Sequence, residues 1–121
     1  MPHPIRIINH ANSALPDVQA LYCDDFISRL RGFTFRREIL MDEGLILVEK
    51  HDSRVDTSIH MLFVWTDLAV FWVNSSFAVV DKILAKSWRP FYASKEPSRY
   101  VIELHPSRLE DFQIGDTVEF K

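Results

Sequence analysis

What this 121-residue sequence has little of already limits what the protein can be. One cysteine excludes an intramolecular disulfide, and three glycines with six prolines argue against a flexible or low-complexity chain. Neither sign of charge dominates, because 14 Lys and Arg face 17 Asp and Glu, for a formal net charge of -3. The broad positive field that general binding to nucleic acid requires is therefore missing.

A long hydrophobic run is also missing. The most apolar stretch, residues 61–73, is shorter than the roughly 20 residues that span a bilayer, and Thr66 and Asp67 interrupt it. The first residues, MPHP, do not have the basic-then-apolar pattern of a secretory signal. We therefore expect a cytoplasmic protein without a membrane span. The chain length and 47% hydrophobic content predict one domain over residues 1–121.

Short strands make up most of the predicted secondary structure. The turn-forming residues 74–76 predict that the apolar run before them and the run after them form an antiparallel hairpin. The run before the turn has six consecutive apolar residues, which predicts burial on both faces, whereas alternation along 100–104 predicts one face that is at least partly wet. The predicted strands are 5–8, 18–22, 44–48, 68–73, 77–84, 100–104 and 117–120.

Two short helices complete the expected fold. Asp24 or Asp25 is placed to cap the first helix and Gly32 to end it. Ser107, with Glu110 three residues later, has the capping-box pattern that starts a second helix. Many short strands without alternating long helices predict a mainly β fold, α+β by strict count. We expect a small antiparallel barrel or sandwich of about seven short strands with one or two short helices.

Few side chains form a recognisable chemical motif. Cys23 adjoins two aspartates that disfavour its thiolate, so a structural role is favoured. A group of four possible ligands, His51, Asp52, Asp56 and His60, does not have the spacing of a zinc motif, and we expect no metal or cofactor. His60 nevertheless borders the apolar segment, where an imidazole needs a defined partner.

Two segments leave alternatives open. Four arginines at positions 29, 31, 36 and 37 could clamp a phosphate or carboxylate, but the nearby acids favour a solvated, charge-balanced face. The segment 88–92, WRPFY, could form a stacking surface for a ligand, or its aromatic rings could fold back and plug the end of a barrel. The plug is the favoured alternative for a domain of this size.

Six segments, taken together, resemble the domain of unknown function 192 family in order and spacing, over about residues 18–120. The resemblance implies a small mostly β domain of bacteria and archaea, in the cytoplasm or behind a signal or lipoprotein segment, and it implies no established reaction. The family usually has an acid where this chain has Ala69. The acid is therefore missing from its usual place, unless Asp67, two residues earlier, substitutes for it. The segments are 28–33 (SRLRGF), 43–48 (EGLILV), 58–63 (SIHMLF), 88–90 (WRP), 100–104 (YVIEL) and 115–118 (GDTV).

Three functions remain open, in this order of preference. The first is a binding or accessory module for a small polar ligand or a partner. The second is a protein–protein interaction domain with an exposed apolar surface, and the third is an enzyme that uses His60 with Asp67 or Glu103. No residue is assigned a catalytic role. For the binding module we expect six side chains to converge on one concavity, namely Arg31, Arg36, His60, Trp88, Arg89 and Glu103.

Overall fold

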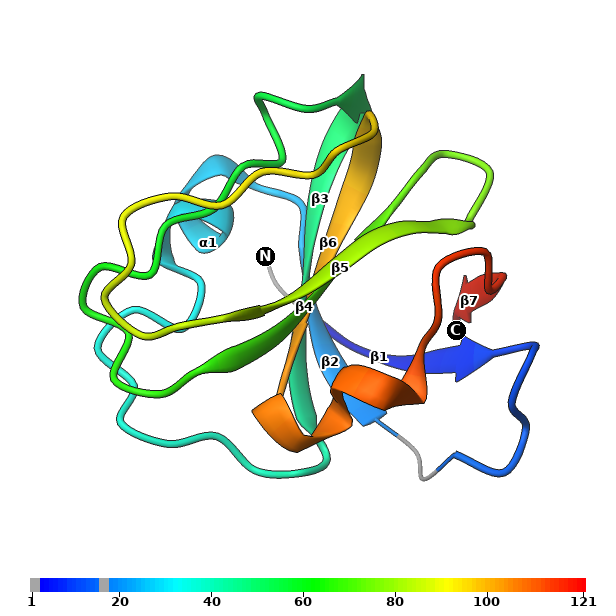
Figure 1. Cartoon of the computed structure of the whole chain (residues 1–121), viewed down its shortest axis with the longest axis horizontal. Coiled ribbons are helices and arrows are strands. Elements are labelled where there is room, and N and C mark those ends of the chain that lie inside the picture. The colour runs from blue at the N-terminus through cyan, green and yellow to red at the C-terminus, as the bar shows by residue number, and fades with distance from the viewer. Residues whose placement is uncertain (1–2, 16–17) are drawn as a thin grey trace.

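A computed structural model describes residues 3–15 and 18–121 of the chain and contains the expected seven strands and two short helices (Figure 1). No helix in these ranges is long and apolar enough to cross a membrane. The helices are α1 (Phe26–Arg31) and the 3-10 helix η1 (Pro106–Asp111). The strands are β1 (His3–Asn9), β2 (Val18–Cys23), β3 (Glu43–Ser53), β4 (Leu68–Val73), β5 (Val79–Ala85), β6 (Ser98–Leu104) and β7 (Val118–Phe120).

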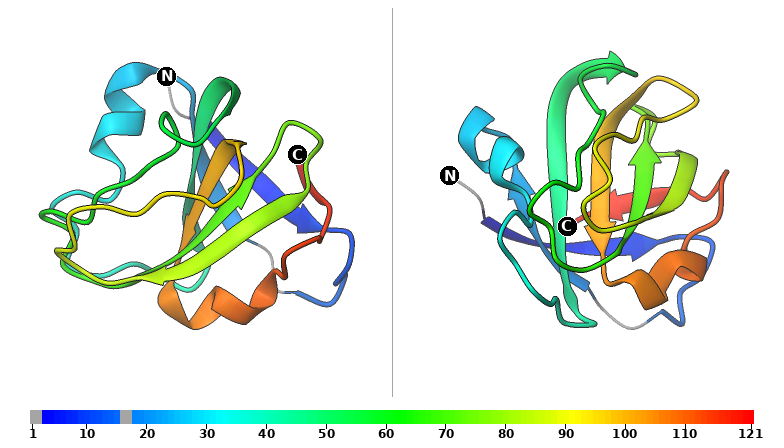
Figure 2. Two further views of the ribbon diagram at one scale, coloured as in Figure 1. Left: turned by 45° about the horizontal axis from the view of Figure 1, so that its top comes forward. Right: turned by 60° about the vertical axis from the view of Figure 1, so that its left-hand side comes forward.

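All seven strands belong to one curled sheet in the order β5-β4-β6-β3-β2-β1-β7 (Figures 1 and 2). Neighbours are antiparallel, including the predicted hairpin of β4 with β5, except that β2 and β3 are parallel. A parallel pair needs a long crossover, which α1 and the segment after it supply. The curl makes a half-barrel, so the predicted mainly β fold with mostly antiparallel pairing is confirmed.

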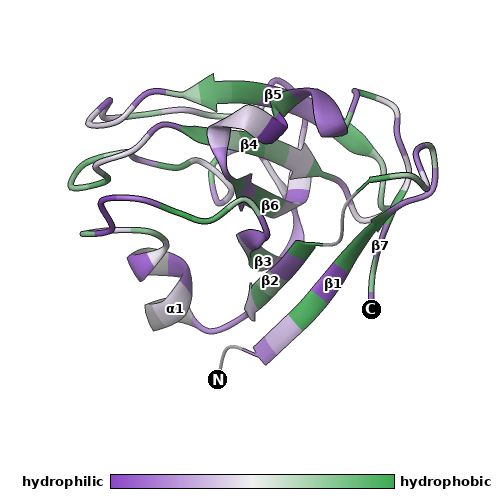
Figure 3. Cartoon of the chain, turned by 90° about the horizontal axis from the view of Figure 1, so that it is seen from below, coloured by the Kyte–Doolittle hydropathy of each residue, from purple (hydrophilic) through white to green (hydrophobic). Residues whose placement is uncertain are grey.

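The middle of the sheet, at β4 and β6, is buried on both faces. Inside the curl, Ala69, Phe71 and Val73 of β4 pack in a core that also contains Phe112, beyond η1. On the outer face, alternate residues of β4 pack under α1 and two long connections, in a second core that includes Trp72. Hydrophobic residues accordingly lie mainly along the strands (Figure 3). The burial of β4 on both faces confirms the prediction from its unbroken apolar run.

The prediction of a wet face on β6 is wrong. Val101 is only 2% exposed and Glu103 only 5%, and both lie on the outer face of the sheet. The long connections cover this face, which alternation within one strand could not reveal. One consequence is that the single acid of β6 is buried.

The two helices begin for different reasons. Asp25 caps α1, because its carboxylate accepts a hydrogen bond from the backbone N–H of Ser28 at 2.8 Å, and Gly32 ends the helix with φ 48°, as predicted. The capping box predicted at Ser107 is wrong. Helix η1 starts one residue earlier at Pro106, and the ring of His105 accepts from Ser107 N instead.

We expect Gly44→Ala to lower the free energy of unfolding by about 1–3 kcal/mol through overpacking. A Cβ at position 44 would lie 2.5 Å from Cδ2 of Leu104 and 3.2 Å from the backbone oxygen of Glu103. Urea denaturation of the wild type, Gly44→Ala, Leu104→Ala and the double variant measures this effect. Because Leu104→Ala removes the closest clashing atom, the two changes should be less than additive in cost, and simple additivity would contradict the clash.

Candidate functional site

Three long connections meet at one end of the half-barrel, on the left in Figure 1. They follow α1, β3 and β5. Backbone hydrogen bonds fix their positions: Phe35 N donates to Phe63 O at 2.7 Å, while Met61 N donates to Arg89 O and Trp88 N to Met61 O, each at 2.8 Å. Segments that are far apart in sequence therefore form one ordered surface at this end.

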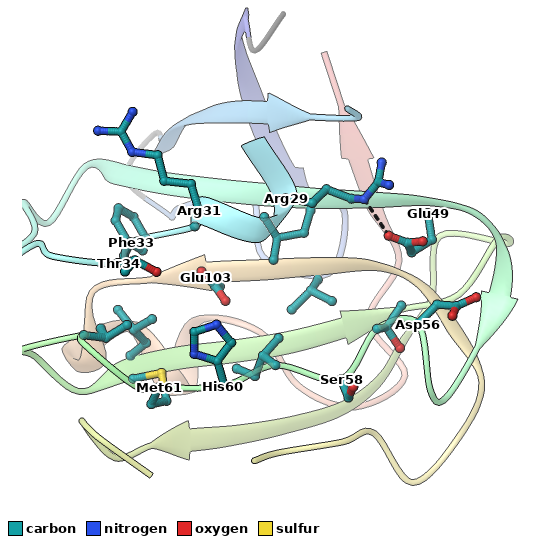
Figure 4. Close-up of a pocket in the computed structure, with 17 residues that line it drawn as sticks. Arg29, Arg31, Phe33, Thr34, Glu49, Asp56, Ser58, His60, Met61 and Glu103 are labelled. Carbon is teal, nitrogen blue, oxygen red and sulfur yellow. Dashed lines mark ion pairs between the residues drawn. The ribbon is translucent and has the colours of Figure 1, made fainter. Parts of the chain in front are cut away.

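A cavity of about 330 Å³ lies between α1, the connections after α1 and β3, and the outer face of the sheet (Figure 4). Its walls are partly apolar, with Phe33, Met61, Val64, Leu68 and Val101 among them. A small set of polar groups also reaches it. These polar residues include Arg29, Arg31, Thr34, Ser58, His60 and Glu103.

Glu103 occupies the wall of this cavity that the sheet supplies. It lies in the central strand β6, opposite Leu45 of β3 and Val70 of β4, so apolar neighbours flank it on both sides. Its Oε1 lies 3.6 Å from where a Cβ on Gly32 would be, which places the end of α1 over the carboxyl group. Burial raises the pKa of Glu103 to about 7, because the charged form is poorly solvated there.

No side chain of the described residues compensates the charge of Glu103. Its carboxyl group has no hydrogen bond or ion pair within 3–15 and 18–121. Arg29 is held elsewhere, by Glu49 at 2.7 Å. The Arg31 side chain is turned away from Glu103, whereas the ring of His60 faces into the same space as the carboxyl group (Figure 4). Glu103 is thus a buried acid that opens into a cavity without a protein counter-charge.

The second predicted carboxylate, Asp67, does not belong to this cavity. It precedes β4 and accepts hydrogen bonds from Ser87 N at 2.9 Å and Lys86 Nζ at 3.4 Å, which tie two connections together. Ala69 lies on the face of β4 that turns away from the cavity. An acid at position 69 would therefore point into the inner core, and Asp67 does not replace it near His60.

A buried cluster of hydroxyl groups holds the connection that carries His60. Thr57 accepts a hydrogen bond at its backbone oxygen from Trp72 Nε1 at 2.8 Å, and its hydroxyl lies 2.9 Å from Ser98 Oγ. The same hydroxyl donates to Ser53 O at 2.7 Å. This cluster was not predicted from the sequence. The available signal was the tryptophan in the apolar run, because a buried indole N–H needs an acceptor.

The six residues predicted to form one site are only partly brought together. Three of them, Arg31, His60 and Glu103, line the cavity, and Arg36 lines a neighbouring hollow of about 590 Å³ that shares Arg31. Trp88 and Arg89 lie outside the residues that line either space. The hollow beside Arg36 offers less for a charged ligand, because Arg36 is already paired with Glu43 at 2.8 Å. Thr34 was missed, because it carries no motif signal, and Ser58 was noted only as part of the segment 58–63.

Pairing among the four arginines is uneven. Arg29 and Arg36 form ion pairs with glutamates, which agrees with the favoured charge-balanced face. The guanidinium of Arg37 lies 5.0 Å from the ring centre of Trp65. Cys23 is buried, and desolvation raises the pKa of its thiol, in agreement with a structural role.

The aromatic segment 88–92 divides between the two alternatives considered for it. Tyr92 packs against the outer core, and its hydroxyl accepts a hydrogen bond from Lys86 N at 2.9 Å, as expected of a plug. Trp88 and Phe91 are instead 40% and 65% exposed. Proline 90 and the positive φ of 65° at Trp88 turn these rings outward.

Exposed aromatic rings form a continuous cluster beside the cavity. Phe63 lies between Phe35 and Trp88 in tilted contacts, with ring centres 5.4 and 4.9 Å away, and Trp65 packs edge-on against Trp88 at 5.1 Å. Phe35, Phe63 and Trp88 all have positive φ, between 62° and 70°. This backbone conformation is costly for bulky residues and is typically kept where the surrounding structure enforces it. We call Phe35, Phe63, Trp65 and Trp88 the aromatic cluster.

Comparison with known proteins agrees with this fold. A UPF0127 protein of Pyrococcus furiosus is 32% identical over 105 residues, with 85% of this chain and 87% of the relative covered. One from Thermococcus gammatolerans is 34% identical, with 94% and 74% covered. A crystal structure of a Sinorhizobium meliloti protein described as a "putative transcription regulator" matches with a TM-score of 0.82, over 99% of this chain and 94% of that one. At 19% identity, this match supports the fold alone.

A family profile identifies the chain as well. The profile of the family named DUF192, described as uncharacterized, matches residues 7–120. The match includes all six segments on which the resemblance rested, and it extends to β1. On this evidence the chain belongs to the domain of unknown function 192 family.

Proposed function

We propose that this domain is a binding module that takes a small polar ligand in the cavity beneath α1. The observation that carries the proposal is the carboxyl group of Glu103, a residue only 5% exposed, whose oxygens are reached through the cavity and have no partner among the described residues. A buried polar group normally has a hydrogen-bond partner, and a missing partner is a reason to look for a ligand. The cavity is near the lower end of the roughly 300–1,000 Å³ typical of small-molecule sites.

The composition of the walls supports the same function. Ligand sites are mainly apolar, with a few placed polar groups that fix orientation. Here Thr34, His60 and Glu103 supply the polar groups among apolar walls. Of the six residues expected from the sequence, we assign His60 and Glu103 to direct contact. We assign Arg31 and Arg36 to the entrance, and we assign no ligand contact to Trp88 and Arg89, which line neither space.

A thermal-stability screen against a library of metabolites tests this function. A ligand at 100 times its Kd stabilises the native state by about 2.7 kcal/mol, which raises the melting temperature measurably. We expect a hit to lose its effect in Thr34→Trp, which fills the cavity, and to keep it in Thr117→Trp, at an exposed position outside the cavity. A hit that stabilises both variants equally would place its site elsewhere.

A second candidate function is pairing with a second copy of this chain through the aromatic cluster. An isologous contact places the same patch on itself, so the patch must carry its own complement. Ring faces and the Arg37 guanidinium supply such a complement, and exposed Glu38 supplies the opposite charge beside it. Size-exclusion chromatography with light scattering tests this pairing. A dimer that Trp65→Ser disrupts would support it, and a strict monomer at high concentration would exclude it.

A further inference from the structure

The chemistry of the cavity points to one class of ligand. Glu103 carries a negative charge when ionised, and the groups around it determine whether that charge is already neutralised. Arg29 is committed to Glu49, and Arg31 turns away from the carboxyl group (Figure 4). The other titratable groups that line the cavity or lie close to Glu103 are Cys23 of β2, and Asp56 and His60 of the connection after β3.

None of these groups supplies a fixed cation to Glu103. Asp56 is an acid, and it lies 3.8 Å from Nε2 of His51, a pair in which both side chains are exposed. His60 is exposed and has no ion pair or hydrogen bond with Glu103 among the described residues. An ionised carboxylate in an apolar setting is unfavourable until a cation or a set of donors reaches it.

We propose that the cavity binds a small organic ammonium compound, an amine with a short hydrocarbon body, whose protonated nitrogen pairs with the carboxylate of Glu103. This inference rests on the proposed binding function and names its ligand class. An ammonium group has three N–H donors. Glu103 can accept from one or two of them, and the hydroxyl of Thr34 faces the same space (Figure 4).

The apolar walls fit the rest of such a ligand. Met61, Val64 and Leu68 are buried residues that line the cavity beside the polar groups. They would contact a hydrocarbon chain and exclude water from the ion pair, which strengthens the pairing. A thioether such as that of Met61 adapts to ligands of different shape. The site therefore selects for a cationic head and an apolar body.

A neutral ligand that accepts a hydrogen bond from protonated Glu103 would show the opposite dependence of affinity on pH. A protonated Glu103 could donate a hydrogen bond to a neutral acceptor, and that ligand would bind best at acid pH. An amine instead requires the ionised carboxylate, so it must displace the proton that the buried group holds at lower pH. Its affinity should fall about tenfold for each pH unit below the pKa of Glu103, which burial raises to about 7.

Calorimetric or NMR titration with butylammonium chloride tests the proposal, and 1-butanol and sodium butyrate serve as neutral and anionic controls of the same size. We expect butylammonium to bind at least tenfold more tightly than either control at pH 8. Glu103→Gln should remove at least tenfold of that affinity, and Glu96→Gln, the same change at an exposed site, should leave it unchanged.

The pH series separates the amine proposal from the alternatives. Affinity for butylammonium should rise from pH 5.5 to 7 and level off above that. Because we assign His60 to direct contact, His60→Gln should change the affinity at pH 8 but keep the same relative rise with pH. Because histidine side chains change charge in the same range, loss of the pH dependence in His60→Gln would overturn the assignment to Glu103. Preference for butanol or butyrate would reject the amine class and leave a ligand site in place. Binding of none of the three, together with a metabolite screen without hits, would reject both proposals.

Discussion

Glu103→Gln should stabilise the protein, and the gain should grow as the pH rises. The folded state holds the pKa of Glu103 at about 7, above its ordinary value of 4.5, because the carboxyl group is buried among apolar neighbours. Between these two values the folded state binds a proton that the unfolded chain has released. The free energy of unfolding of the wild type therefore falls with rising pH in this window.

The size of the effect follows from the width of the window. The pKa difference corresponds to about 3 kcal/mol of destabilisation, reached above pH 8 and absent below about pH 4.5. Glutamine cannot ionise, so Glu103→Gln should match the wild type near pH 4.5 and exceed it by about 3 kcal/mol, or roughly 10 °C in melting temperature, at pH 8. Urea denaturation of both proteins from pH 4.5 to 8.5 measures the difference.

The exposed Glu96 provides the matched control for this experiment. Glu96→Gln removes the same charge from the chain, but it should change the free energy of unfolding by less than about 0.5 kcal/mol at every pH. A stability gain in Glu103→Gln that does not vary with pH would show that the carboxyl group is not strained by burial. The ligand proposal would then lose its main support.

Trp72→Ala should destabilise the protein by about 3–5 kcal/mol, the cost of removing a large aromatic side chain from a packed core. Trp72 is 1% exposed and lies in the centre of the outer core. Its Nε1 also donates to the backbone oxygen of Thr57, so its loss releases the connection that carries His60. Chemical denaturation measures the first effect, and hydrogen exchange at residues 58–60 measures the second.

Trp72→Phe separates packing from hydrogen bonding. It keeps most of the apolar contact but leaves the carbonyl of Thr57 without its donor, which costs about 1–3 kcal/mol when the group stays buried. Faster exchange at residues 58–60 in this variant would show that the indole N–H positions the site. Trp65→Ala is the control, because Trp65 is 46% exposed and its removal should leave that exchange unchanged.

Much of the fold could be read from the sequence. The unbroken apolar run of β4, the turn after it and the glycine at the end of α1 all predicted the observed elements, because local periodicity and turn chemistry act over a few residues. The parallel pair of β2 and β3 was not predicted. Pairing between strands depends on how a crossover packs, and no local pattern in the sequence determines that.

The candidate site could be read only in part. Glu103, His60 and Arg31 were named from the sequence, and all three line the cavity. Their neighbour Thr34 carried no signal, and Ser58 stood out only as part of the segment 58–63. Trp88 and Arg89 were expected in the same concavity, but the backbone of their connection directs these side chains elsewhere. A side chain in a long connection takes its direction from distant hydrogen bonds, and single-sequence spacing cannot reveal these.

The sequence by itself determined which chemical groups this protein has: one thiol flanked by two aspartates, no metal motif, a balanced charge and a set of short, mostly apolar strands. The tertiary structure decided whether the Glu103 side chain is buried or solvated. Alternation in β6 predicted an acid on a wet face, but the connections after α1 and β3 fold over that face and remove it from water. A strand determines on which side its residues lie, whereas the packing of distant segments decides whether that side is solvated.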